Sequence, residues 1–115
     1  MEGYKDLIVW QKSMQLVKLV YAITDQLPQQ ERYVLISQML RSAISIPSNI
    51  SEGWSRNRPQ EFIRFLEIAY ASGCELETQL LISQDRYPKV NYAETQSLLT
   101  EVKKITSRLI QNRIH

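Results

Sequence analysis

Apolar residues recur along this chain at spacings of three and four, which is the period of an amphipathic helix. The pattern predicts four helices, which span about residues 7–26, 29–55, 59–86 and from 92 onward. The short connections between them favour antiparallel neighbours. We therefore predict an all-α, up-down-up-down four-helix bundle, with residues 1–115 forming one domain.

Prolines and polar residues predict the boundaries of these helices. Asp6 is expected to cap the first helix, and Pro28 to separate the first from the second. Pro59 should lie at the start of the third helix, capped by Asn57 or Arg58. Pro88 ends the third helix, and Asn91 with Glu94 forms a capping-box-like pair before the fourth.

The second predicted helix contains a proline, which removes a backbone donor and costs roughly 3 kcal/mol or more. Helical spacing nevertheless continues through it, at Ile36, Leu40, Ala43, Pro47, Ile50 and Trp54. We therefore predict one kinked helix rather than two separate helices. In the third helix, small residues from Ala69 to Cys74 predict the closest helix crossing.

The first and fourth helices carry more apolar residues than one core-facing stripe requires. Their inner faces are predicted at Leu7, Trp10, Met14, Val17 and Tyr21, and at Leu98, Val102, Ile105 and Leu109. The remaining apolar residues are Val9, Leu16, Val20 and Ile23, then Tyr92, Leu99, Ile110 and Ile114. Large exposed apolar patches usually mark interfaces, so we expect a homo-oligomer through these residues. The alternative is a wide core that absorbs them.

The composition excludes several classes of function. Cys74 is the only cysteine, so neither an internal disulfide nor a zinc site of paired cysteines is expected. The chain shows neither a signal-peptide pattern nor an apolar run long enough to span a bilayer, which favours the cytoplasm and no membrane partner.

The inventory of catalytic groups is also poor. The one histidine is the terminal residue, His115, and no glycine-rich phosphate loop occurs. We therefore expect no enzyme, no cofactor, no metal and no small-molecule substrate. Asn49 and Glu52 are interpreted as part of a structural hydrogen-bond network.

The positive charge is concentrated at the C-terminal end. Residues 89–115 contain five basic and two acidic residues, a net charge of +3, against −1 for residues 1–88. Candidate phosphate-binding residues form two groups, Lys103, Lys104, Arg108 and Arg113, and Arg56, Arg58 and Arg64. The alternative is an ordinary solvated helix face.

Four segments together resemble a known family: residues 6–12, 45–53 (Ser-Ile-Pro-Ser-Asn-Ile-Ser-Glu-Gly), 61–66 and 75–80 (Glu-Leu-Glu-Thr-Gln-Leu). The chain resembles the four-helix bundle proteins encoded within intervening sequences of bacterial 23S rRNA genes. That family is similar to the accessory variability determinant of diversity-generating retroelements. The resemblance implies a homopentameric ring with a basic surface that binds nucleic acid and a reverse transcriptase.

Two non-enzymatic functions follow as hypotheses. The first is an oligomeric scaffold or accessory protein that binds RNA or DNA through its basic patches. The second is a protein-interaction module on which the basic residues are incidental. Binding of RNA near physiological salt discriminates between them.

Overall fold

The computed structural model describes residues 3–114, with side chains through residue 112, as a helical chain. Its long helices are α1 (Ile8–Thr24), α2 (Ser37–Ser55), α3 (Pro59–Arg86) and α4 (Ala93–Ile114). Short helices precede the first two: η1 (Tyr4–Asp6), η2 (Gln29–Glu31) and η3 (Arg32–Ile36). The described residues include no β-strand, so the predicted fold class is confirmed.

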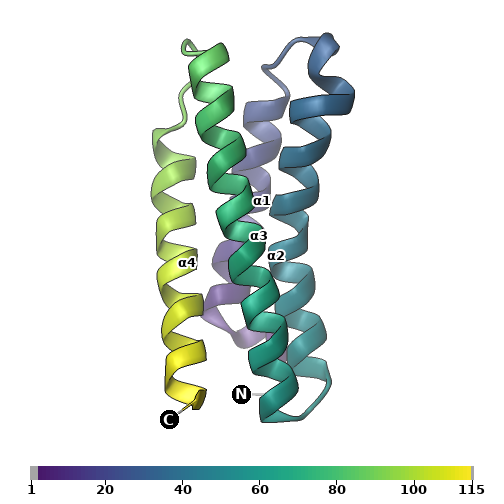
Figure 1. Cartoon of the computed structure of the whole chain (residues 1–115), viewed down its shortest axis with the longest axis vertical. Coiled ribbons are helices and arrows are strands. Elements are labelled where there is room, and N and C mark those ends of the chain that lie inside the picture. The colour runs from purple at the N-terminus through teal and green to yellow at the C-terminus, as the bar shows by residue number, and fades with distance from the viewer. Residues whose placement is uncertain (1–2, 115) are drawn as a thin grey trace.

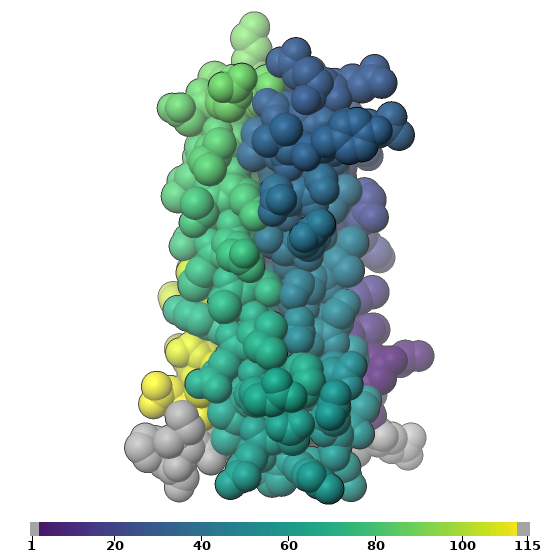
Figure 2. Space-filling model, turned by 45° about the vertical axis from the view of Figure 1, so that its right-hand side comes forward, coloured from purple at the N-terminus to yellow at the C-terminus, as the bar shows by residue number. Residues whose placement is uncertain are grey.

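The four helices run antiparallel along an elongated molecule of 43 × 20 × 20 Å, with both chain ends at the same end (Figure 1). Contacts join α1 to α2, α2 to α3, α3 to α4 and α4 back to α1, so the bundle is square in cross-section. The α1–α2 and α3–α4 sides are therefore opposite one another. Figure 2 shows α2 and α3 side by side along the length of one face. No described helix is long and apolar enough to cross a membrane.

The helical run over residues 29–55 continues through Pro47, as the spacing predicts. The proline ring is buried, and its missing N–H leaves the carbonyl of Ala43 without its helical donor. Just after it, the Ser48 hydroxyl donates to the Ile44 carbonyl at 2.7 Å. Side-chain hydroxyls that bond the carbonyl one turn back are associated with bends in helices.

A polar network beside Pro47 connects α2 to α3. The Asn49 amide donates to the carbonyl of Ser45 at 2.8 Å and to its hydroxyl at 2.9 Å. That hydroxyl lies 2.8 Å from the hydroxyl of Ser72 on α3. The interpretation of Asn49 as structural is therefore confirmed, whereas Glu52 lies outside this network and pairs with Arg56.

The ends of the helices follow most of the predicted signals. Pro59 is the first residue of α3, with Arg58 as its N-cap. Asn57 adopts the left-handed conformation, with φ 57°, that turns the chain between α2 and α3. The Asn91 carboxamide oxygen accepts the N–H of Ala93 at 3.0 Å. The prediction for α1 was wrong, because the N-cap there is Leu7 rather than Asp6.

The predicted inner face of α1 was wrong in part: Leu7 belongs to the core and Trp10 and Val17 pack against it, but other predicted residues do not. Val9, Leu16, Val20 and Ile23, expected at an oligomer interface, are core residues, none more than 2% exposed. Met14 and Tyr21, expected inside, are 39% and 45% exposed. Ser13 explains the error, because it is fully buried on the true inner face and its hydroxyl donates to the Trp10 carbonyl at 2.8 Å. A buried hydroxyl satisfied in this way belongs to the core, although the apolar pattern does not count it.

Helix α4 requires a similar correction. Tyr92 and Leu99, expected at an oligomer interface, are 2% and 1% exposed and belong to the core with Val102. Ile110 is half-buried against that core, and the Ile114 side chain lies outside the described residues. Of the residues predicted inside, Val102 is in the core as expected, whereas Leu98, Ile105 and Leu109 are half-buried. The wide-core alternative therefore accounts for the interface residues that the structure describes.

Two glycines mark close approaches between helices. A Cβ at Gly73 on α3 would lie 3.1 Å from Cγ of Lys103 on α4, within the predicted small-residue stretch. A Cβ at Gly53 on α2 would lie only 2.6 Å from Cβ of Phe65 on α3. The tighter of the two is thus at Gly53, outside that stretch. Phe65 Cβ is fixed to its backbone, whereas the Lys103 side chain is flexible.

We predict that Gly53→Ala destabilises the protein by about 1–3 kcal/mol, the usual cost of overpacking a core. Gly73→Ala is the matched control. Its methyl group displaces a flexible side chain, and alanine gains about 1 kcal/mol of helix propensity over glycine. Urea unfolding of both variants measures the difference. Equal stability of the two variants would show that the helices adjust freely at Gly53.

Candidate nucleic-acid interface

A shallow groove between α3 and α4 contains three of the predicted phosphate-binding residues. It has a volume of about 370 Å³ and is lined by Tyr70 and Glu77 of α3 and by Thr100, Lys103, Lys104, Ser107 and Arg108 of α4. Its charged side chains are three cations and one carboxylate. The sequence prediction that Lys103, Lys104 and Arg108 form one basic surface is consistent with this placement.

Lys103 is held inside the groove by α3. Its aliphatic stem passes over Gly73, where the absent side chain leaves room for it. Its Nζ bonds Glu77 Oε1 at 3.1 Å and lies 5.5 Å from the centroid of the Tyr70 ring, a cation–π contact. The Lys103 side chain is only 17% exposed. Lys103 therefore forms part of the wall of the groove, and little of its positive charge is accessible to a ligand.

The environment raises the pKa of Lys103. Partial burial acts to lower it, but the hydrogen bond to Glu77 and the nearby Cys74, Glu77 and Tyr70 favour the charged form and outweigh burial. The amine therefore remains protonated throughout the physiological pH range. The groove keeps a fixed positive charge beside the ring of Tyr70.

Lys104 and Arg108 are the accessible cations of the groove. Both side chains are exposed, and neither forms an ion pair within the described part of the chain. They lie four residues apart on α4, so about 6 Å of helix axis separates them. The side chain of Arg113, the fourth predicted member, lies outside the described residues.

Sequence reasoning missed Tyr70, an aromatic residue that is 37% exposed at the groove. Tyr70 is distant in the chain from the basic residues of α4, so a search for charge clusters along the sequence does not reveal it. The signal that could have found it is its register on α3. Tyr70, Cys74 and Glu77 follow helical spacing beside Gly73, where α4 makes its close approach.

The second basic cluster, at the α2–α3 turn, is largely neutralised. Arg56 pairs with Glu52 at 3.0 Å and with Glu61 at 3.7 Å, and Arg64 pairs with Glu61 at 3.0 Å. Both guanidinium groups also contact the ring of Phe65, with 5.2 Å and 4.4 Å to its centroid. These two arginines therefore have structural partners that compete with a phosphate.

Ionisation of the Glu61 carboxyl is favoured in this cluster. The hydrogen bond from Arg64 lowers the pKa of Glu61; burial opposes this effect, and the charges of Arg64, Arg56 and Arg58 add to it, so that the pKa is lowered overall. The same pair raises the pKa of Arg64. The Glu61 carboxylate thus remains charged well into the acidic range and continues to neutralise the turn.

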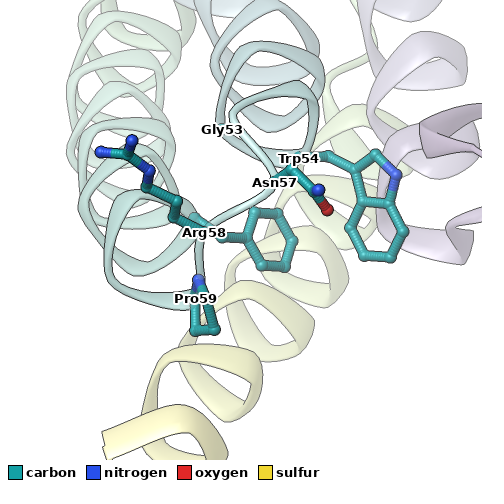
Figure 3. Close-up of a pocket in the computed structure, with 6 residues that line it drawn as sticks. Gly53, Trp54, Asn57, Arg58 and Pro59 are labelled. Carbon is teal, nitrogen blue, oxygen red and sulfur yellow. The ribbon is translucent and has the colours of Figure 1, made fainter.

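Arg58 is the accessible cation at the turn, since it forms no ion pair with any described residue. It lines a hollow of about 170 Å³ with Gly53, Trp54, Asn57, Pro59 and Phe62. In Figure 3 the Arg58 side chain extends away from Trp54, on the opposite side of the turn. Its guanidinium is therefore presented to solvent.

The described residues contain no cluster of three His, Cys, Asp or Glu side chains that could hold a metal ion. The chemistry present in the groove is cationic, aromatic and hydroxylic. Such a surface suits ionic contact with phosphates and stacking with bases.

The square antiparallel bundle and the basic groove define a small helical protein with a charged surface site rather than a deep pocket. The family model of the 23S rRNA-intervening sequence protein matches residues 5–111. The chain therefore belongs to the 23S rRNA-intervening sequence protein family, which confirms the resemblance found in its sequence.

A solved structure supports this assignment. A protein of unknown function from the S23 ribosomal protein family of Bacteroides thetaiotaomicron VPI-5482 is 25% identical to this chain. The alignment covers 90% of this chain and 98% of that one, with a TM-score of 0.80. Comparison with curated proteins gave no match.

Proposed function

We propose that this protein is a non-enzymatic nucleic-acid-binding scaffold that contacts phosphates through the α3–α4 groove. The observation that carries the proposal is the pair Lys104 and Arg108, which are exposed, lack ion pairs among the described residues and line one groove with Tyr70. Cations of this kind bind phosphates by releasing condensed counterions. The groove contains no base-reading motif, so we expect binding without strong sequence preference.

The turn cluster contributes less to the proposed contact. Two of its three arginines are engaged by Glu52, Glu61 and Phe65, which leaves Arg58 as its accessible cation. Both α4 and the α2–α3 turn reach the end of the bundle where the chain also ends (Figure 1). One protomer therefore presents few accessible cations. An oligomer would present the same cations several times, which would strengthen binding by avidity.

Self-association of the bundle is the second part of the proposal. A groove of about 290 Å³ between α1 and α2 is lined without any charged residue, by Tyr4, Trp10, Met14, Val17, Ile44, Pro47, Ser48 and Ser51. Met14 and Ile44 are 39% and 41% exposed there. The resemblance to the retroelement accessory protein implies a homopentamer, so we propose a second copy as the occupant of this surface.

From the same resemblance we propose a reverse transcriptase as the protein partner of the oligomer. The alternative function is a protein-interaction module with no nucleic-acid role, and the uncharged α1–α2 groove is the observation that favours it. The two functions differ in one measurable property, which is salt-dependent binding of nucleic acid.

Charge reversal tests the nucleic-acid surface. We predict that Lys104→Glu with Arg108→Glu weakens binding to RNA and flattens the slope of log affinity against log salt, by about 1.4 for a single strand and about 1.8 for a duplex for each groove occupied. Fluorescence anisotropy over a salt series measures both effects.

The matched control reverses two other exposed cations that form no ion pair among the described residues, Lys5 and Lys18, with the same change in net charge. Equal loss of affinity in the two double variants would assign binding to overall charge rather than to the groove. Wild-type protein that fails to bind RNA near physiological salt would favour the interaction module.

Charged substitutions test self-association. We predict that Met14→Lys with Ile44→Glu converts the oligomer to monomers, because each places a charge in an apolar interface. Light scattering coupled to size exclusion measures the mass, and circular dichroism verifies the fold. Leu81→Lys, at a residue of α3 that is 55% exposed, is the control and should retain the oligomer. A monomeric wild-type protein, or dissociation by Leu81→Lys alone, would contradict the assigned surface.

A further inference from the structure

Tyr70 gives the α3–α4 groove a feature that phosphate binding does not require. One exposed aromatic ring lies among the cations, with the Lys103 ammonium 5.5 Å from its centroid. A fully structural tyrosine is normally covered, with its hydroxyl bonded to a partner. Tyr70 is instead 37% exposed, and its hydroxyl has no hydrogen bond to the described residues.

We propose that the groove binds single-stranded nucleic acid, with an unpaired base stacked on Tyr70 and the neighbouring phosphates held by Lys104 and Arg108. This inference rests on the proposed function and names its substrate class. Positive charge that follows the backbone, combined with aromatic rings that stack bases, is the combination by which proteins bind single strands.

The shape of the surface supports a single strand over a duplex. The groove lies between two packed helices, and the accessible cations follow α4 over about 6 Å, roughly one helical turn. Paired bases are stacked inside a duplex and present only their edges, so they offer no face to Tyr70. An unpaired base offers its face, and Ser107 lines the same groove with a hydroxyl able to bond a base edge or sugar, while the Thr100 hydroxyl, which donates to the Gln96 carbonyl at 3.0 Å, can accept one further hydrogen bond.

Lys103 prepares the ring for this role. Its ammonium is held by Glu77 at 3.1 Å and its stem by the close approach at Gly73, so the cation stays beside Tyr70 without a ligand. The ring is therefore fixed in advance, and binding orders few side chains. Glu77 also occupies Lys103, which leaves the phosphate contacts to Lys104 and Arg108.

The test compares Tyr70→Leu with Tyr70→Phe on four fluorescent probes of equal length: single-stranded RNA, single-stranded DNA, duplex RNA and an abasic strand. We expect Tyr70→Leu to weaken binding of both base-bearing single strands by about 5- to 150-fold, which corresponds to about 1–3 kcal/mol for a stacked base. Tyr70→Phe retains the ring and should bind as wild type. Duplex and abasic probes should not respond to either substitution.

Tyr33→Leu is the matched control. Tyr33 is 83% exposed and also has a cation–π contact, with the Arg32 guanidinium 5.7 Å from its ring centroid, but it lies outside the groove. It should leave binding unchanged. Equal weakening of base-bearing and abasic strands by Tyr70→Leu would overturn stacking. Unchanged binding in Tyr70→Leu, with loss in the double variant of Lys104 and Arg108, would overturn the inference and leave the proposed function standing. Absence of binding to every probe would overturn both.

Discussion

The small residues of α3 are the constraint on which the arrangement of this bundle depends. Ser72 faces α2, where its hydroxyl meets that of Ser45, and the adjacent Gly73 faces α4, where the stem of Lys103 fills the missing side chain. Two neighbouring small residues thus allow α3 to lie close to both partners. A larger residue at position 73 would push the flexible Lys103 stem aside and move its ammonium relative to Tyr70. The packing of α3 against its neighbours and the geometry of the basic groove therefore depend on the same pair of residues.

Ion pairing decides which cations of this protein remain accessible. Arg56 and Arg64 enclose Phe65 and share Glu61, whereas Lys104 and Arg108 project from α4 without a carboxylate partner among the described residues. The sequence alone shows that all of these residues are basic, but not which of them have a carboxylate partner. Exposed ion pairs contribute little to stability, but a paired arginine must lose its carboxylate before it neutralises a phosphate. The two clusters thus differ in how many unpaired cations they present, although both consist of basic residues.

Much of the fold could be predicted from sequence, because helix ends carry local signals such as Pro59 and Asn91, and spacing continues through Pro47. The orientation of α1 and α4 could not. Both helices are apolar over a wide arc, and the deciding residues are Ser13 and Thr106, whose buried hydroxyls donate to the carbonyls of Trp10 and Val102 one turn back, at 2.8 and 2.7 Å. Hydrophobic patterns treat such residues as exposed. The basic residues of the groove could be predicted, because they lie near one another in the sequence of α4. Tyr70 could not, because it comes from α3.

The two proposed surfaces are linked by the number of accessible cations. One groove offers Lys104 and Arg108, and two neutralised phosphates release too few counterions for firm binding at physiological salt. The α1–α2 groove lies on the opposite side of the square bundle from the α3–α4 groove, so a copy that docks in the α1–α2 groove does not itself cover the basic groove of the same protomer. A strand that contacts several grooves gains affinity through effective concentration. In the proposed function, self-association through α1–α2 would supply the repeated grooves that so modest a basic surface needs to bind nucleic acid.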